Sequence, residues 1–197
     1  PAGAICTGTN VTFTASITNG GAGPIYQWQV NGGNVGINSN TYSSTTLNNG
    51  DIVTCILTSN ALCASPASVT SNGISMVVTP TVAPTISITA APPGAICAGT
   101  NVIFTASITN GGGSPTYQWQ LNAVNVGINS NTYSNAGLVN GDQITCTLTS
   151  NDPCAAPLVV VSNTITMVVT ANTIPTISIV AAPAGAICAG TNVTFTA

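Results

Sequence analysis

Tyr26-Gln27-Trp28-Gln29-Val30-Asn31 is the stretch that decides the fold, because its pattern returns 91 residues later as Tyr117-Gln118-Trp119-Gln120-Leu121-Asn122. The cysteines keep this spacing in three sets, which are Cys6, Cys97 and Cys188, then Cys55 and Cys146, then Cys63 and Cys154. Self-similarity at a fixed period is typical of an array of domains rather than one large domain. The sequence therefore predicts a repeat over residues 1–80 that lacks its first strand, a complete repeat over 81–171, and the first strands of a third over 172–197.

Short β-strands are expected throughout, because Ser, Thr, Asn and Gly separate short runs of Val, Ile and Ala. The strand-like runs of the first repeat and of the start of the second are Val11–Thr18, Ile25–Val30, Thr41–Leu47, Ile52–Ser59, Val69–Val78 and Thr85–Ala90. Turn signals such as Asn19-Gly20 and Asn49-Gly50 separate them. Apolar and polar residues alternate along the strands, which directs Phe13 in the first repeat and Cys146 in the second to a core.

The number and spacing of the strands indicate the fold class. About seven short strands in about 90 residues, with a tryptophan on the third and a cysteine on the sixth, form the immunoglobulin-like pattern. We therefore expect an all-β protein of tandem immunoglobulin-like β-sandwich domains arranged head to tail. The predicted core residues are Trp28, Trp119, Phe13, Phe104, Cys55 and Cys146. Because Phe13 stands where strand B of an antibody domain has a cysteine, the disulfide that joins the two sheets of antibody domains is in doubt.

Several short motifs resemble the Ig-like and PKD-like repeats of giant surface adhesins of gliding, type IX secreting bacteria. These motifs are Tyr26-Gln-Trp-Gln-Val-Asn-Gly, Asn34-Val-Gly, Asn40-Thr-Tyr, Leu47-Asn-Asn-Gly-Asp, Val53-Thr-Cys-Ile-Leu-Thr-Ser-Asn and Ile74-Ser-Met-Val-Val. They return at the equivalent positions from Tyr117 to Val169. The resemblance implies a bacterial surface adhesin with a role in gliding motility, and it does not imply a particular activity, because such modules are mostly stalks.

The cysteines indicate an oxidising compartment outside the cytoplasm. They recur at identical offsets without histidine and without a Cys-x-x-Cys pair, which favours a disulfide framework over a zinc site. The disulfide candidates are Cys6, Cys63, Cys97, Cys154 and Cys188. Cys55 and Cys146 are expected to remain free thiols in the core.

Two pairings of these cysteines remain open. In the immunoglobulin strand order, Cys6 lies at one end of the sandwich and Cys63 at the other, roughly 20 Å apart, whereas a disulfide needs α-carbons within about 7 Å. In a head-to-tail array Cys6 can instead reach Cys154 of the next domain. Different packing of the first strands would allow Cys6 to bond to Cys63 or to Cys55 within one domain. Short junctions marked by prolines, such as residues 79–84, predict closely spaced and stiffly linked domains.

Composition argues against most chemistry. The chain contains no Lys, Arg or His and only three acidic residues, for a formal charge of −3, so we expect no nucleic-acid partner. Apolar runs are too short for membrane insertion. Catalysis needs a group that moves a proton near neutral pH, and a Ser or Cys nucleophile here has no partner base. Asp51 and Asp142 follow Asn-Gly, which favours turn capping, and Asp152 lies in a loop. We expect no catalytic residue, no metal site and no cofactor.

The sequence thus predicts a structural repeat in the shaft of an extracellular filament or adhesin on a bacterial surface, acting as a rigid, disulfide-stabilised spacer. Its expected partners are neighbouring repeats and other copies of itself in a fibre. One alternative is a carbohydrate-binding module in which Tyr26, Trp28, Tyr117 and Trp119 contact surface polysaccharide. Another is ice binding by rows of threonine such as Thr12 and Thr14.

Overall fold

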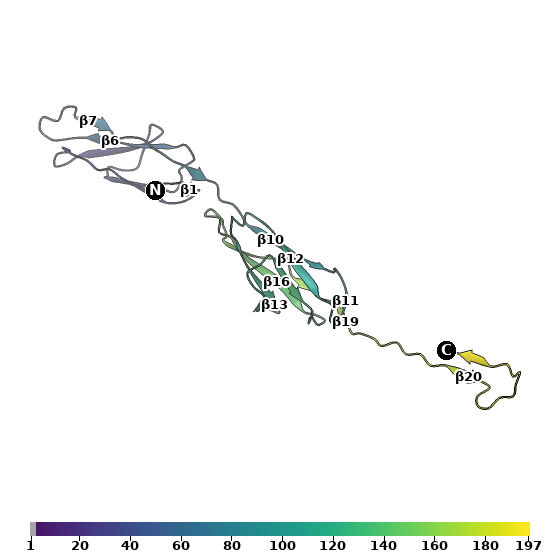
Figure 1. The fold of residues 1–197 in the computed structure, drawn as a ribbon. Helices are drawn as coiled ribbons and strands as arrows, with labels where there is room; N and C mark the ends of the chain where they lie inside the picture. Colours follow the sequence, from purple (N-terminus) through teal and green to yellow (C-terminus); the bar gives the residue numbers. More distant parts are fainter. Residues whose placement is uncertain (1–2) are drawn as a thin grey trace.

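The computed structural model describes residues 3–197 as two β-domains in line, followed by a hairpin (Figure 1). The strands of the first domain are β1 (Ile5–Cys6), β2 (Val11–Thr14), β3 (Ile25–Val30), β4 (Gly33–Val35), β5 (Thr41–Ser44), β6 (Ile52–Thr58), β7 (Ser68–Thr70), β8 (Ile74–Ser75) and β9 (Val78–Thr79). One sheet has the order β4-β3-β6-β7, and β8 also pairs with β6. The opposite layer is the antiparallel pair β2-β5, and β1 pairs in parallel with β9.

The second domain repeats this arrangement and has one further strand. Its strands are β10 (Thr85–Ala91), β11 (Ile96–Cys97), β12 (Val102–Thr109), β13 (Thr116–Leu121), β14 (Val124–Val126), β15 (Thr132–Asn135), β16 (Gln143–Thr149), β17 (Val159–Val161), β18 (Ile165–Thr166) and β19 (Val169–Thr170). One sheet has the order β14-β13-β16-β17, the other the order β10-β12-β15, and β11 pairs in parallel with β19. The chain ends in the hairpin of β20 (Val180–Ala182) and β21 (Thr194–Thr196).

Strand alternation produces the two cores. Val11 and Phe13 of β2 are buried while Thr12 and Thr14 face solvent, as a period of two requires. The buried residues of the second core include Val102, Phe104, Trp119, Ile144 and Cys146, each with 0% of its surface exposed. Each domain is thus a sandwich whose inner faces are apolar and whose outer faces carry Thr, Ser, Asn and Gln.

The predicted fold class is confirmed. The chain is all-β and consists of tandem domains with the sheet topology of immunoglobulin and fibronectin type III modules. The tryptophans lie on equivalent strands, Trp28 on β3 and Trp119 on β13, and each is directly opposite the core cysteine of the neighbouring strand. Trp28 pairs in register with Cys55, and Trp119 with Cys146.

Several strand predictions were wrong in detail. The run Val69–Val78 is not one strand but is divided into β7, β8 and β9, because Asn72-Gly73 interrupts the ladder. The run Thr41–Leu47 ends as a strand at Ser44, although Leu47 is still buried. Two-residue strands such as β1 carry no periodic signal, so the parallel pairing of β1 with β9 could not be expected from the residue pattern.

The run Val11–Thr18 also ends early, since β2 stops at Thr14. The equivalent strand of the second domain, β12, continues to Thr109 with almost the same residues. β10 pairs with β12 along its length, whereas β2 has no such neighbour on that edge among the described residues. Strand length here depends on the partner strand rather than on local sequence.

Among residues 3–197, no helix has the length and apolarity that crossing a membrane requires.

Candidate functional site

The junction between the two domains is the most specialised region of the molecule. A disulfide joins Cys6 of the first domain to Cys154 of the second, with the α-carbons 5.3 Å apart and a sequence separation of 148. Of the two pairings left open by the sequence, the structure contains the one between neighbouring domains. Cys6 does not bond to Cys63 or Cys55.

Cys6 reaches the junction because β1 pairs with the last strand of its own domain. Ile5 and Thr7 donate backbone hydrogen bonds to the carbonyl oxygens of Val77 and Thr79, at 2.9 Å each. The parallel register places Cys6 beside Thr79, where the chain leaves the domain. The first strand and the exit of the first domain therefore face the second domain together.

The linker between the domains is bonded to the same loop that carries Cys154. Val82 donates to the Cys154 carbonyl oxygen at 3.0 Å and accepts from the Ala156 N–H at 2.9 Å, which forms a parallel bridge with this loop. The Asn110 side-chain amide donates to the carbonyl oxygen of Ala83 at 2.9 Å. Two separate attachments, one covalent and one of hydrogen bonds, hold the second domain against the end of the first.

Asp152 shapes the loop that presents Cys154. Its carboxylate accepts the backbone N–H of Cys154 at 2.8 Å, and its own N–H donates to the Ser150 hydroxyl at 3.1 Å. The hydroxyl of Ser150 in turn donates to the Asn110 carbonyl oxygen at 3.0 Å. The sequence predicted only that Asp152 lies in a loop and missed this role. An Asp two residues before a junction cysteine could have indicated that its carboxylate accepts the backbone N–H of that cysteine.

The remaining cysteines fall into two groups. Cys63, Cys97 and Cys188 are free and exposed, and Cys55 and Cys146 are free and buried. Cys97 occupies on β11 the position that Cys6 occupies on β1. Burial raises the pKa of the Cys146 thiol to about 11, and burial also raises the pKa of Cys55. Because the thiolate is the reactive form, these two core thiols are chemically inert at neutral pH.

Thiol labelling at pH 8 is expected to follow this division. A disulfide reagent such as DTNB should react promptly with the three exposed cysteines of the native chain and with all five free cysteines only after unfolding. A Cys97→Ser variant should lower the prompt count by one and leave the rest unchanged. Prompt labelling of Cys146 in the native chain would contradict the burial described above.

The aspartates at the Asn-Gly turns cap those turns, as expected from the sequence. Asp51 accepts the backbone N–H of Asn48 and the side-chain amide of Asn31, both at 2.8 Å. Asn31 then accepts the N–H of Ile52 at 2.9 Å, which fixes the start of β6. Asp142 has the equivalent contacts and is 7% exposed. Neither carboxylate faces a second acidic group, so their geometry suits turn formation.

The Asp51 contacts predict an acid sensitivity of the first domain. Hydrogen bonds from the Asn48 backbone and the Asn31 side chain lower the pKa of Asp51 below its ordinary value of 3.8. The stabilisation is therefore complete above about pH 3.8 and is lost as pH falls through the folded-state pKa. Trp28 fluorescence during urea unfolding, in a Trp119→Phe background, should show the loss as the pH is lowered below the ordinary Asp pKa of 3.8. An Asp51→Asn variant should have a flatter pH profile in this range, and an identical profile would contradict the assignment.

The aromatic residues that could have formed a carbohydrate platform lie mostly inside the domains. Trp28 is 4% exposed and Trp119 is 0% exposed. Each indole N–H donates to a backbone carbonyl oxygen at 2.9 Å, that of Ser39 or Ser130. No group of three or more His, Cys, Asp or Glu side chains gathers as a metal site within residues 3–197.

Comparison with known proteins found similarity to solved structures but no matching family. No protein-family model matches this chain, and no curated protein matches it significantly. Among solved structures, it is similar to fibronectin(III)-like modules of Clostridium thermocellum CbhA, with 14% identity and a TM-score of 0.36 over 85% of this chain and 88% of that one. It is also similar to the N-terminal four Ig domains of Dscam1 isoforms 1.9 and 7.44, with 14% identity, a TM-score of 0.34 and 85% of this chain covered in each case.

The chain spans 43% and 42% of those two Dscam1 chains, which is less than half of their length. Similarities at this level concern the fold alone. The description of this chain as tandem Ig-like or fibronectin type III-like domains rests on its own sheet topology and strand register.

Proposed function

We propose that this chain is a spacer segment in the shaft of an extracellular filament or adhesin on a bacterial surface, in which the junction disulfide keeps neighbouring domains in line. The disulfide between Cys6 and Cys154 is the observation that carries the proposal. The bond joins residues of different domains and lies outside both core clusters. It therefore fixes how the domains are placed relative to each other.

The second attachment supports the same role. A single tether leaves a joint free to rotate, whereas the linker at Val82 and the disulfide at Cys6 hold the Cys154 loop at two points. Bending or twisting at the joint then requires breaking hydrogen bonds or distorting a covalent link. Interfaces between domains of one chain otherwise permit relative motion by default.

The same junction can be repeated along a longer array. Cys97 is exposed on β11, at the position equivalent to Cys6, and would bond to a following domain through a residue equivalent to Cys154. Cys63 would bond to the domain before it by the same rule. Each domain then contributes one cysteine to each neighbour, and the core thiols take no part.

The surface location rests on the disulfide and on the resemblance to adhesin repeats. Disulfides persist in oxidising environments outside the cytoplasm. The resemblance to repeats of gliding, type IX secreting bacteria favours export to the cell surface and a part in adhesion or gliding. We propose that the chain is not an enzyme, because its sequence has no His, Lys, Arg or Glu, its three aspartates accept backbone N–H groups of turns and a loop, and no metal cluster lies within residues 3–197. Immunogold labelling of intact cells tests the location, and label confined to the cell interior would refute it.

The exposed cysteines allow a direct test of the spacer role. Spin labels on Cys63 and Cys97, in a Cys188→Ser background, place one label on each domain, and the width of their distance distribution reports motion at the junction. The native chain should give a narrow distribution. A Cys6→Ser, Cys154→Ser variant should give a clearly broader one while Trp fluorescence shows both domains folded. Equal widths would show that the disulfide does not align the domains.

Glycan arrays address the carbohydrate alternative. A spacer should give no saturable signal with any polysaccharide. Saturable binding that is lost on substitution of Tyr26 or Tyr117, which are partly exposed, would favour the carbohydrate-binding module instead.

A further inference from the structure

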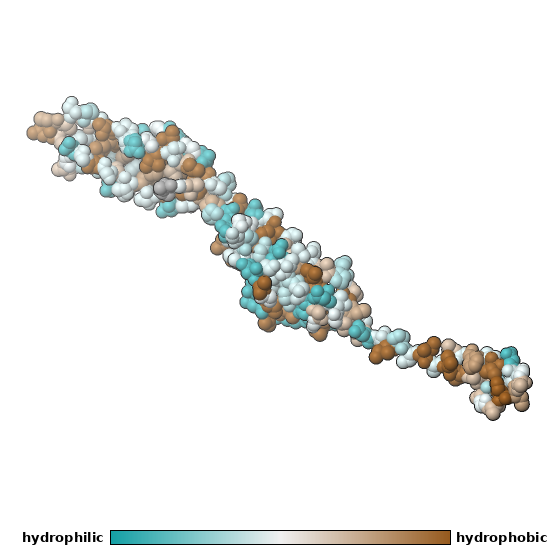
Figure 2. All heavy atoms as spheres, in the orientation of Figure 1, coloured by the Kyte–Doolittle hydropathy of each residue, from teal (hydrophilic) through white to brown (hydrophobic). Residues whose placement is uncertain are grey.

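The turn between β12 and β13 contacts both segments that meet at the junction. This turn, the hairpin tip of the second domain, consists of residues 110–114. It contacts the Cys154 loop, residues 150–156, and it contacts the linker at Ala83. Figure 2 shows a narrow waist where the two domains meet, so a small number of contacts determines how they are joined.

The Cys154 loop is docked on the hairpin tip by backbone hydrogen bonds. The Asn151 N–H donates to the Gly111 carbonyl oxygen at 3.1 Å. The Ser114 N–H donates to the side-chain oxygen of Asn151 at 3.0 Å. These bonds lie within the second domain, so the loop keeps its position without a contribution from the first domain.

Gly112 allows the hairpin tip to approach this loop closely. Its φ is +80°, and a Cβ here would lie 2.6 Å from the backbone nitrogen of Asp152 and would also overlap the side-chain oxygen of Asn151. A backbone atom cannot turn aside as the end of a long side chain can, so a larger residue must displace Asp152. Because the Asp152 carboxylate accepts the N–H of Cys154 at 2.8 Å, the displacement would reach the cysteine.

The hairpin tip also holds the linker. The Asn110 side-chain amide donates to the Ala83 carbonyl oxygen at 2.9 Å. Next to this contact β10 begins at Thr85, whose hydroxyl oxygen lies 2.6 Å from that of Thr109. The linker therefore enters the second domain at a fixed place, beside the loop that the same tip supports.

Docking of the linker confines Cys6. Cys6 lies beside Thr79 in the parallel pairing of β1 with β9, and Val82 lies three positions after Thr79. Val82 is hydrogen-bonded to the Cys154 loop. Three residues of extended chain span at most about 11 Å. Once the linker is docked, Cys6 therefore stays in the neighbourhood of Cys154 even before a bond joins them.

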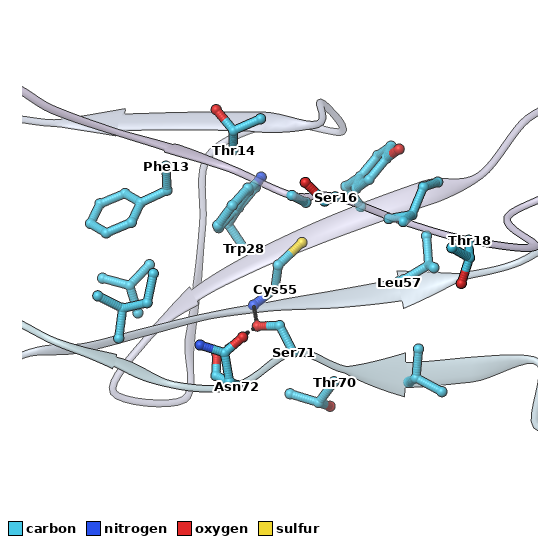
Figure 3. A pocket seen from close by; sticks show the side chains of 16 residues that line it. Phe13, Thr14, Ser16, Thr18, Trp28, Cys55, Leu57, Thr70, Ser71 and Asn72 are labelled. Atoms are coloured by element: carbon cyan, nitrogen blue, oxygen red, sulfur yellow. Dashed lines mark hydrogen bonds between the residues drawn. The ribbon is translucent and has the colours of Figure 1, made fainter. Parts of the chain in front are cut away.

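The other thiols are poorly placed to compete for Cys6. Cys55 lies inside the first sandwich beside Trp28 (Figure 3) and is buried. The loop between β6 and β7, which carries Cys63, is at the other end of the first domain (Figure 1). Cys97 is on β11, at the far end of the second domain (Figure 1). Position rather than reactivity thus separates Cys154 from the exposed thiols.

We propose that the hairpin tip docks the linker and the Cys154 loop before the disulfide forms, and so selects Cys154 as the partner of Cys6. Asn110 and Gly112 are its positioning residues. The inference deepens the proposed spacer function, and it rests on the junction disulfide on which that function depends. It assigns the alignment of the domains to contacts that exist before oxidation, which the disulfide then makes permanent.

The oxidant in this step is a small disulfide such as oxidised glutathione. One protein thiolate attacks it, forms a mixed disulfide and releases one glutathione thiol. The second protein thiolate attacks the protein sulfur of the mixed disulfide and releases the other. Two protein thiols lose two protons and two electrons, and one glutathione disulfide becomes two glutathione thiols.

The equilibrium between dithiol and disulfide in glutathione buffers measures the positioning. Acid quenching and maleimide trapping give the reduced and oxidised fractions, from which the effective concentration of the two thiols follows. A short flexible tether gives about millimolar values, so a docked junction should clearly exceed them. The chain for these measurements has Ser in place of the three exposed free cysteines, which are Cys63, Cys97 and Cys188.

Two substitutions in the hairpin tip should lower this effective concentration. Asn110→Gly removes the amide that contacts Ala83 and keeps a residue suited to the φ of +51° at this position. It should cost about threefold to tenfold, the worth of one hydrogen bond. Gly112→Ala should cost about tenfold or more, because it strains the tip and displaces the Cys154 loop.

The first domain provides matched controls. Its own hairpin tip, residues 19–21, has a φ of +55° at Asn19. A Cβ on Gly21 would lie 2.5 Å from the backbone nitrogen of Ala61. Asn19→Gly and Gly21→Ala therefore make the same local changes away from the junction, and they should leave the effective concentration unchanged.

Tryptophan emission of the reduced chains separates positioning from folding. Trp28 and Trp119 should keep native emission in every variant that is compared, and Asn110→Gly tests the role even if Gly112→Ala does not fold. Unchanged effective concentration in Asn110→Gly, or an equal loss in the control Asn19→Gly, would overturn the positioning role.

Hydrogen exchange tests the order of the two events. In a Cys6→Ser, Cys154→Ser chain the N–H groups of Val82 and Ala156, which join the linker to the Cys154 loop, should stay protected. Adding Asn110→Gly should raise their exchange rates by about threefold to tenfold. Exchange as fast as in an unfolded chain, already in the double-serine variant, would show that docking follows oxidation and would refute the proposal.

These results are distinguishable from failure of the spacer role. Fast exchange at Val82, or an unaltered glutathione equilibrium in Asn110→Gly, refutes the positioning role while a narrow spin-label distribution of the native chain leaves the spacer role standing. Equal label widths with and without the disulfide refute the spacer role, whatever the glutathione equilibrium shows.

Discussion

Removing the junction disulfide by Cys6→Ser, Cys154→Ser is expected to lower the free energy of unfolding of each domain by about 4 to 5 kcal/mol. The bond joins residues 148 positions apart. Because the two domains have separate cores, we expect each to unfold while the other stays folded. Because Thr79 lies beside Cys6 in the folded first domain, the loop that the bond closes when the second domain unfolds has about 75 residues. When the first domain unfolds, the disulfide closes a loop in the same way, because the linker at Val82 is hydrogen-bonded to the Cys154 loop of the folded second domain.

Urea denaturation followed by tryptophan fluorescence measures this effect. Trp28 reports the first domain and Trp119 the second, so Trp→Phe variants separate the two transitions. Cys97→Ser removes an exposed free thiol at the position equivalent to Cys6 and should leave both midpoints within experimental error. Reduction of the native chain should reproduce the double-serine result. Unchanged midpoints in the double-serine variant would mean that the bond adds nothing to domain stability.

Trp119→Ala is expected to lower the free energy of unfolding of the second domain by about 3 to 5 kcal/mol. The side chain is 0% exposed, and its ring centroid lies 6.3 Å from that of Phe104 and 5.9 Å from that of Tyr133. Truncation leaves a cavity between the sheets and leaves the Ser130 carbonyl oxygen without the indole donor that now contacts it at 2.9 Å.

Thermal or urea unfolding of the second domain, followed by near-ultraviolet circular dichroism, measures the loss. Trp119→Phe keeps most of the ring volume and should cost clearly less than the alanine variant. Since Trp28 lies in a separate core, the midpoint of the first domain should move little in either variant. A small effect of Trp119→Ala would show that the core collapses around the site more readily than the packing indicates.

The cores were predictable because alternation is a local property of the chain. Phe104 and Cys146 lie in strands whose neighbours alternate between apolar and hydroxyl side chains, and both are fully buried. The turn roles of Asp51 and Asp142 could also be predicted, since an aspartate after Asn-Gly accepts hydrogen bonds from nearby backbone groups.

The junction could be predicted only as one of two alternatives. Whether Cys6 meets Cys154 depends on the pairing of β1 with β9 and on the bridge between Val82 and the Cys154 loop. Both are contacts between short segments that are far apart in the sequence and carry no periodicity. The length of β2 was mispredicted for a related reason, because a strand extends only as far as a neighbour pairs with it.

The bond between Cys6 and Cys154 also determines how the chain would respond to tension. A pull applied between the two ends passes from residue 6 directly through the sulfur atoms to residue 154. Residues 7–153, which include nearly all of both domains, form a closed covalent loop outside the loaded path. Under stretching, the strands within residues 7–153 could not be drawn out until the disulfide broke, whereas β17, β18 and β19 of the second domain, which follow Cys154, lie in the loaded path and could be pulled away.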